Sequence, residues 1–213
     1  MPSLEAYKAR YFFETSALAA EALQVVDFVG QDDISQNFRF DLNLVSNDAE
    51  IEFADVINKP ATLTMMRGDE PVKIHGLIAD FQQGGRTADW VAYRATLVPR
   101  LWLLALNYQS RVFQNMKVEE IITQILKDAG FASDDFRFSL KANYKPREYC
   151  VQYRETDLNF ISRLMEFEGM YFFFEHGDDR ETMVIVDDRS ENPMIDGEST
   201  ISYSTGGGLI TEG

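Results

Sequence analysis

The sequence is poor in the residues from which metal and catalytic centres are usually built. It has one cysteine, Cys150, and two histidines, His75 and His176, among 213 residues. A single cysteine excludes an intramolecular disulfide and indicates a fold that needs no covalent staple. A zinc site needs three or four nitrogen or sulfur ligands, and these residues could supply three only by folding together from far apart. Neither H-E-x-x-H nor C-x-x-C spacing occurs. We therefore interpret these three residues as structural and expect no metal and no cofactor.

Long apolar runs are also missing. No stretch approaches the roughly 18 apolar residues that would span a bilayer. Glu5, Glu14 and Glu21 interrupt any signal-peptide core at the start of the chain. The sequence thus predicts a soluble protein that is assembled in the cytoplasm and has no membrane anchor. If it leaves the cell, it does so by a route that reads no N-terminal signal.

Basic residues are scarce relative to acidic ones. The chain has 20 lysines and arginines against 35 aspartates and glutamates, which gives a formal net charge of -15. Residues 1–60 hold eleven acids and four bases, and residues 178–213 hold nine and two. Binding to nucleic acid needs a basic face that replaces phosphate counterions, and an anionic membrane would repel such a chain. Both partners are therefore excluded, and the excess charge is explained most simply by solubility.

The first hundred residues show the alternation of antiparallel strands. Phe38, Phe40, Leu42 and Leu44 alternate with polar residues, which is typical of a half-buried strand. Gly76 lies inside a long strand and predicts a bulge or a bend. We expect turns at 67–71 and 83–86. Six strands with no long helix predict an antiparallel β-barrel over residues 1–98, with strands at 8–15, 23–30, 37–46, 59–66, 72–83 and 89–98.

The pattern changes after Pro99 and predicts a smaller α+β domain over residues 99–190. A short helix or a packed turn is expected at 100–106, a helix with a regular apolar stripe at 118–129, and a short strand at 149–153. Thr156 has the character of a helix cap, Asp157 suits the first helical turn, and Gly169 ends the helix. Two strands at 170–176 and 181–188 form a hairpin. Residues 191–213 are interpreted as a linker and the start of another barrel.

The acidic residues of this second region suggest two kinds of chemistry, catalysis by paired carboxylates and calcium binding. Glu166 and Glu168 resemble the carboxylate pair of a glycoside hydrolase, but two residues apart on a helix they point in different directions. Four aspartates near the hairpin are conceivable calcium ligands, although solvated turns are the commoner explanation. The arginines are expected to form exposed ion pairs that contribute little. No G-x-S-x-G motif occurs, so we assign no catalytic residue. The four candidate calcium ligands are Asp178, Asp179, Asp187 and Asp188. The expected ion pairs join Arg154 and Arg163 to Glu155, Asp157 or Glu166, with Asp157–Arg163 as one example.

Several segments together resemble a known family. RETDLNFISRLMEFEGMYFFFEH, at residues 154–176, is similar to the signature segment of the VgrG proteins, which are the spike and hub proteins of type VI secretion systems. VVDFVGQDDISQNFRFDLNLVSND, NKPATLTM, IHGLIADF and YRATLVPRLWLLAL followed by SRVFQNMKVEEIITQIL resemble other parts of the same family, in the same order. The signature residues are Pro99, Arg100, Leu101, Trp102, Arg154, Glu155, Thr156, Asp157, Arg163, Glu168 and Gly169.

The resemblance implies a phage tail hub-like fold, mainly β with an α+β part. In that family two barrels similar to the tube protein are present in each chain, and three chains form a pseudo-sixfold ring beneath the hexameric tube of Hcp. The implied role is structural: the subunit joins tube to spike and carries effectors, and no catalytic residue is shared by the family in this region. This chain ends at Gly213, where the second barrel is expected to begin, so it resembles a fragment or a natural truncation.

Two alternatives and one interface hypothesis accompany this interpretation. A baseplate hub of a contractile-tailed phage has a similar sequence in this region, and a cell-wall glycan hydrolase is a remote alternative from another class. For the hub, we hypothesise that the acidic first sixty residues contact the tube through charge complementarity. Asp27, Asp32 and Asp33 are the candidate contact residues.

Overall fold

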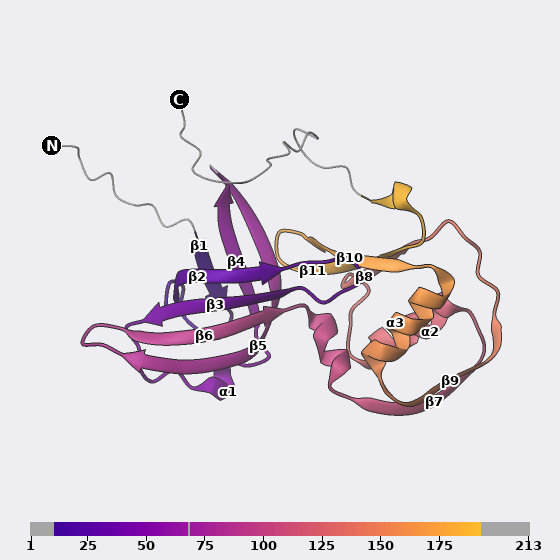
Figure 1. Cartoon of the computed structure of the whole chain (residues 1–213), viewed down its shortest axis with the longest axis horizontal. Helices are drawn as coiled ribbons and strands as arrows, with labels where there is room; N and C mark the ends of the chain where they lie inside the picture. The colour runs from indigo at the N-terminus through magenta and orange to yellow at the C-terminus, as the bar shows by residue number, and fades with distance from the viewer. Residues whose placement is uncertain (1–10, 68, 193–213) are drawn as a thin grey trace, which may run out of the picture.

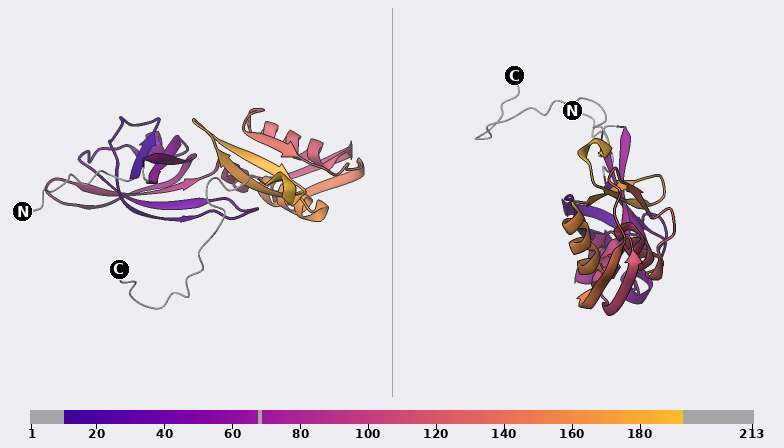
Figure 2. Two further views of the ribbon diagram at one scale, coloured as in Figure 1. Left: turned by 90° about the horizontal axis from the view of Figure 1, so that it is seen from above. Right: turned by 90° about the vertical axis from the view of Figure 1, so that its right-hand side faces the viewer.

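The computed structural model describes residues 11–67 and 69–192, which form two lobes along the long axis of the molecule (Figure 1). Viewed from above, the lobes lie end to end (Figure 2). The elements in chain order are β1 (Tyr11–Thr15), β2 (Gln24–Gln31), β3 (Arg39–Ser46), α1 (Phe53–Val56), β4 (Pro60–Arg67), β5 (Glu70–Arg86), β6 (Val91–Val98), η1 (Arg100–Ala105), β7 (Tyr108–Met116), α2 (Val118–Asp128), β8 (Phe136–Ser139), β9 (Arg147–Thr156), α3 (Asp157–Glu168), β10 (Tyr171–His176), β11 (Glu181–Val186) and η2 (Arg189–Glu191).

The first lobe is one antiparallel sheet in the order β1-β4-β5-β6-β3-β2. The sheet curls until its two edges approach one another, and the rings of Tyr11 on β1 and Phe28 on β2 meet edge to face at 5.2 Å. The edge strands are not hydrogen-bonded neighbours, so the barrel is open along this line. The expectation of an antiparallel barrel followed by a smaller α+β part is confirmed.

Alternation explains the packing of this sheet. On β3 the side chains of Phe40, Leu42 and Leu44 are buried, whereas the polar residues between them face solvent. The inward side chains stack in the concave interior, where the rings of Phe81 and Tyr93 lie parallel at 5.2 Å. The hydroxyl of Tyr93 donates to the carbonyl of Asp48 at 2.8 Å, which satisfies the polar end of a buried ring.

The longest strand corrects two details of the sequence prediction. β5 continues through the expected turn at 83–86, and the chain reverses at 87–90 instead, where the N–H of Thr87 donates to the carbonyl of Trp90 at 2.8 Å. β5 has two register irregularities opposite β6, between Ile78 and Asp80 and between Gln83 and Arg86, and neither falls at Gly76. Gly76 is needed for a different reason: a Cβ there would lie 2.4 Å from the carbonyl oxygen of Val98.

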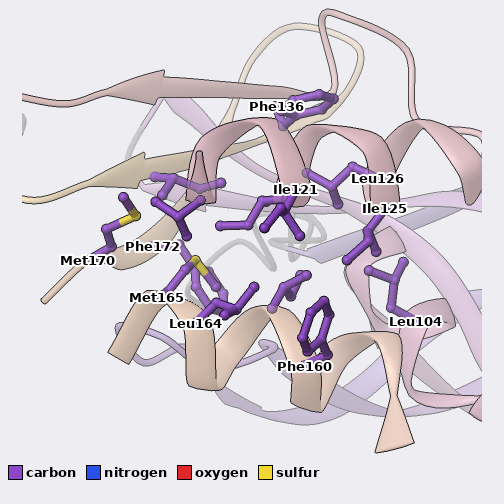
Figure 3. Packing of buried hydrophobic residues seen from close by; sticks show 14 of the residues in the cluster. Leu104, Ile121, Ile125, Leu126, Phe136, Phe160, Leu164, Met165, Met170 and Phe172 are labelled. Carbon is purple, nitrogen blue, oxygen red and sulfur yellow. The ribbon is translucent and has the colours of Figure 1, made fainter. Parts of the chain in front are cut away.

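The second lobe has its own core between the two helices and the small sheets. Side chains of α2 and α3 point toward one another, and Phe136 and Met170 border them (Figure 3). One sheet pairs β7 with β9, and the other has the order β10-β11-β8, in which β8 runs parallel to β11. Ile121, Ile125 and Leu126 come from α2, and Phe160, Leu164 and Met165 come from α3.

Sequence patterns had not indicated β7 and β8. On β7 only Phe113 is buried, so the strand shows no apolar alternation, and β8 is only four residues long. The two hydrophobic clusters fall on either side of residue 99, yet the division into domains at 1–98 and 99–190 stays a prediction. Of the predicted linker at 191–213, residues 193–213 lie outside the described residues. None of the described helices is long and apolar enough to cross a membrane.

Candidate functional surfaces

The helix of the signature segment begins and ends as the sequence predicts. Thr156 precedes α3, and its Oγ1 accepts the backbone N–H of Asn159 at 3.1 Å, which satisfies one of the free donors at the helix start. Gly169 follows α3 in the left-handed conformation, with φ of 73°. These two residues therefore set the length of the helix that faces α2.

Asp157 is held inside the lobe and does not pair with Arg163. The residue is only 7% exposed, and its Oδ1 accepts from the Nη2 of Arg111 and from the Nε2 of Gln152, the latter at 2.8 Å. Arg111 also donates to the side chain of Gln152 at 3.0 Å. Sequence reasoning missed this network because Arg111 lies on β7, a strand that had not been predicted, and Gln152 lies opposite it on β9.

The other charged residues of the signature segment also find partners in their own lobe. Arg163 donates to both carboxylate oxygens of Glu155, at 2.6 Å in the shortest contact, and to the carbonyl of Val151 at 2.9 Å. These hydrogen bonds from Arg163 lower the pKa of the Glu155 carboxyl. Glu168 accepts from Arg147 at 2.5 Å. The arrangement fixes the middle and the C-terminal end of α3 to β9.

Arg154 has a different environment. It is the extra residue of a β-bulge opposite Gln109 and Ser110, and its φ is 49°. Its N–H donates to the Oγ of Ser110 at 3.2 Å, and its guanidinium lies over the ring of Tyr153. None of the ion pairs formed within residues 11–67 and 69–192 involves Arg154, so its expected pairing with an acid is not found.

The segment after β6 connects the lobes through buried contacts. Leu101 is buried in the core of the second lobe, and Trp102 is half-buried. The backbone N–H of Arg100 donates to the Oε1 of Glu181 at 2.8 Å, and its guanidinium donates to the carbonyl of Gly130 at 2.7 Å. Pro99 precedes η1 in extended conformation. These contacts fix the direction in which the chain enters the second lobe.

The three candidate tube-contact residues lie on one exposed edge. Asp27 belongs to β2, the edge strand of the six-stranded sheet, and Asp32 and Asp33 follow directly after it. Asp27 accepts from the side-chain amide of Asn43 and Asp33 from that of Gln31, both at 2.6 Å. All three are exposed, and their described hydrogen-bond partners are neutral. The same edge also exposes Val26, Val29 and Ile34.

The structure brings the two histidines together, which the sequence had not indicated. His75 on β5 and His176 at the end of β10 lie with ring centroids 6.2 Å apart at the junction of the lobes. A cavity of about 390 Å³ opens beside His75, and the two arginines in its lining form ion pairs, Arg100 with Asp135 and Arg180 with Asp179. Within the described ranges no group of three or more histidine, cysteine, aspartate or glutamate side chains is arranged for a metal ion. Cys150 is buried in the second core.

The acids of the hairpin region have structural partners. Asp187 accepts the backbone N–H groups of Lys141 and Ala142 at 2.8 and 2.9 Å, and the hydroxyl of Tyr144 at 2.9 Å. Asp188 accepts the N–H of Ser190 at the start of η2. Because these carboxylate oxygens already accept hydrogen bonds, the two aspartates hold the loop in place and are not arranged as a cation-binding site.

Comparisons with known proteins agree on one family. Residues 31–212 match the family model described as phage tail baseplate hub (GPD). The type VI secretion system spike protein VgrG1b of Pseudomonas aeruginosa is 39% identical over 173 residues, which cover 81% of this chain and 23% of that protein. VgrG1c of the same organism is 36% identical over 203 residues, which cover 95% and 28%. The chain thus spans about a quarter of the length of these curated relatives.

A solved structure shows the same fold. The Escherichia coli c3393 protein is described as a component of the type VI secretion system with structural similarity to the T4 bacteriophage tail proteins gp27 and gp5. It superposes with a TM-score of 0.80 at 29% sequence identity, over 85% of this chain and 50% of that one.

Proposed function

Because the chain belongs to the phage tail baseplate hub family, we propose that it forms part of the hub of a type VI secretion spike. The observation that carries the proposal is the close superposition on a type VI component across both lobes, together with 36–39% identity to two spike proteins. The function is structural: the chain connects the hexameric tube to a trimeric spike and transmits the push of a contracting sheath. A baseplate hub in a phage would use the same architecture.

The geometry supports a role that depends on rigidity. Each lobe has a continuous buried core, and the signature residues fasten α3 to β9 and η1 to β11. We assign Pro99, Arg100, Leu101 and Trp102 to the connection between lobes, and Thr156, Asp157 and Gly169 to the placement of α3. In this proposal no residue of the region makes or breaks a bond. Glu166 and Glu168 do not form a catalytic pair, because Glu168 is held by Arg147.

The proposed partners are an Hcp-type tube hexamer, two further copies of the full-length chain, and effector proteins that travel with the spike. Assembly takes place in the cytoplasm, and export follows through the apparatus without a signal peptide. Obligate interfaces of this kind bury roughly 2,000–5,000 Å². The exposed edge formed by β2 and Asp27, Asp32 and Asp33 is the proposed tube contact, since an unpaired edge strand offers both backbone groups and charge.

The oligomeric state tests the hub assignment directly. The absolute mass of this 213-residue chain is measured by light scattering over a range of concentrations, beside a chain extended to the length of the spike relatives. We expect a trimer for the extended chain and a monomer for the short one, because the relatives are about four times as long and we place most of the trimer interface beyond this region. Monomers in both samples would overturn the spike assignment.

The tube contact is tested by neutralising the edge. Asp27→Asn, Asp32→Asn and Asp33→Asn are combined in one variant, and binding of the cognate Hcp-type tube protein is followed at several salt concentrations. We expect a several-fold lower association rate at low salt and a weaker salt dependence. The matched control, Asp69→Asn, Asp89→Asn and Glu148→Gln, removes the same charge from exposed positions elsewhere. Equal rates in the three proteins would exclude this edge.

A further inference from the structure

The two lobes meet where the hairpin of β10 and β11 reaches β5. The N–H of Ser35 donates to the carbonyl of Phe172 at 2.8 Å, and the rings of Phe38 and Phe174 meet edge to face at 5.2 Å. At the tip of the hairpin, Lys73 of β5 donates to the carbonyl of Asp178 at 3.2 Å. His75 and His176 lie between these contacts and join one lobe to the other directly.

The contact between the histidines replaces a missing strand. β6 ends opposite Leu77, so β5 continues toward Glu70 without a hydrogen-bonded neighbour on that side. His176 fills the gap, because its Nδ1 accepts the backbone N–H of His75 at 3.1 Å. His75 returns the contact with its own ring: Nε2 donates to the carbonyl of Gly177 at 2.9 Å, and Nδ1 accepts from the hydroxyl of Thr62 at 2.9 Å.

The two rings respond differently to a proton. A proton on Nδ1 of His75 is tolerated, since the hydroxyl of Thr62 can reverse its role and accept. A proton on Nδ1 of His176 is not tolerated in the same way. It would point at the backbone N–H of His75, which is also a donor, so the hydrogen bond between them would be lost. The other nitrogen of His176, Nε2, is buried and has no hydrogen-bond partner among the described residues. The docked geometry therefore accommodates only neutral His176.

We infer that the histidine pair is an acid-sensitive latch: a proton on His176 releases the tip of the β10–β11 hairpin from β5 and loosens the junction between the lobes. The latch is closed at neutral pH, where the junction is held by the hydrogen bonds described above. It opens in acid by loss of the acceptor at Nδ1. This inference does not depend on the hub assignment, because it concerns only contacts within one chain.

The electrostatic surroundings favour the same direction. Burial, and after it the proximity of His75, lowers the pKa of His176 from 6.5 to about 4. His176 in an undocked hairpin would regain an ordinary pKa, so undocking takes up a proton as the pH falls through this window. For these two pKa values the docking equilibrium is about 20-fold weaker at pH 5 than at pH 7.

The charged groups around His75 and His176 do not remove the acid dependence of hairpin docking. Glu181, on β11 opposite His176, has its carboxylate turned to the N–H of Arg100, and burial raises its pKa. Asp179 pairs with Arg180 in the exposed turn. From the segment before β3, the ring of Phe38 meets His176 edge to face at 5.4 Å. Besides His75, the titratable and charged side chains on the elements around His176 are Glu70, Lys73, Asp80 and Arg86 on β5, Tyr171 and Glu175 on β10, Asp178, Asp179 and Arg180 in the turn, and Glu181 on β11.

The chain is well suited to a direct test because it has only two histidines. The ring resonances of both are followed by nuclear magnetic resonance in the 213-residue protein between pH 8 and pH 3.5, together with hydrogen exchange of the His75 amide, corrected for its intrinsic pH dependence. We expect the His176 ring to titrate more than one pH unit below 6.5, and the His75 amide to lose at least tenfold of its protection over the same range. Titration of His176 near 6.5 with unchanged protection would overturn the latch.

A variant separates the latch from general acid unfolding. His176→Asn retains an acceptor near the position of Nδ1 but does not titrate, so the acid-dependent loss of protection at residue 75 should disappear. His75→Gln, the matched control, removes the other imidazole and should leave an acid transition in place. Persistence of the full transition in His176→Asn would contradict the inference. The wild-type titration decides the question by itself if either variant fails to fold.

Discussion

The charged residues of the signature segment and those at the β2 edge differ in what holds them. In the second lobe, Glu155, Asp157 and Glu168 each bind an arginine of the same lobe. At the edge, Asp27 and Asp33 bind only the neutral side chains of Asn43 and Gln31. A dense and varied set of charges can thus be wholly structural, while a sparser set on an exposed edge remains available to a partner. Function in this region is expected where charges lack internal partners.

The largest effect that tests this contrast is expected at Asp157. Asp157→Ala leaves Arg111 and Gln152 without their shared acceptor inside the lobe, and removal of one partner of a buried ion pair is strongly destabilising. We expect the free energy of unfolding to fall by about 3 kcal/mol, measured by urea denaturation. Asp128→Asn is the matched control, because Asp128 pairs with the same arginine at 3.3 Å from an exposed position. The control should change stability by less than about 1 kcal/mol.

Equal losses in the two variants would show that burial does not decide the role of this carboxylate, and the contrast between the lobes would fail there.

The sequence alone placed Asp157 correctly at the start of α3 but gave it the wrong partner. Helix ends depend on local chemistry, so Thr156 and Gly169 could be recognised from neighbouring residues. The partner of Asp157 comes from a strand that starts nearly fifty residues earlier, and no local pattern records such a pairing.

The same distinction explains the rest of the fold. The strands of the first lobe were predictable because one face of the sheet is buried and the residues alternate, as on β3. β7 carries exposed Tyr108 and Val112 on its outer side, so its pattern gave no such signal. The histidine pair could not be predicted either, since His75 and His176 are brought together only when the hairpin docks on β5. Tertiary contacts of this kind cannot be predicted from local sequence patterns.

A medium effect is expected at the C-terminal end of α3. Gly169 has φ of 73°, and a Cβ at this position would meet no atom within 4 Å, so a substitution there tests backbone strain alone. We expect Gly169→Ala to lower the free energy of unfolding by about 1 kcal/mol, as measured by thermal and chemical denaturation. Gly85→Ala serves as the control, because it also has open space but no positive φ. A loss as large in the control would rule out conformational strain as the cause.

A smaller effect is expected for the exposed pair of Arg163 and Glu155. Glu155→Gln should lower stability by less than about 1 kcal/mol at neutral pH, because solvent and salt screen the pair. Since Arg163 lowers the pKa of Glu155 in the folded state, the contribution is present above the unfolded pKa of about 4.3 and is lost as the pH falls through the lower folded value. Denaturation at pH 7 and pH 3 measures both. A difference between wild type and variant that does not shrink as the pH falls would refute the ion-pair account.

The smallest effect on stability is expected at the edge itself. In the combined variant Asp27→Asn, Asp32→Asn and Asp33→Asn, no arginine or lysine among the described residues loses a bonded partner. The free energy of unfolding should therefore stay within about 0.5 kcal/mol of wild type, as for ordinary surface substitutions, when measured by urea denaturation. A slight gain is consistent with less repulsion between neighbouring carboxylates. A loss of several kcal/mol would mean that these acids are structural, like those of the second lobe, and would remove the reason for assigning them to a partner.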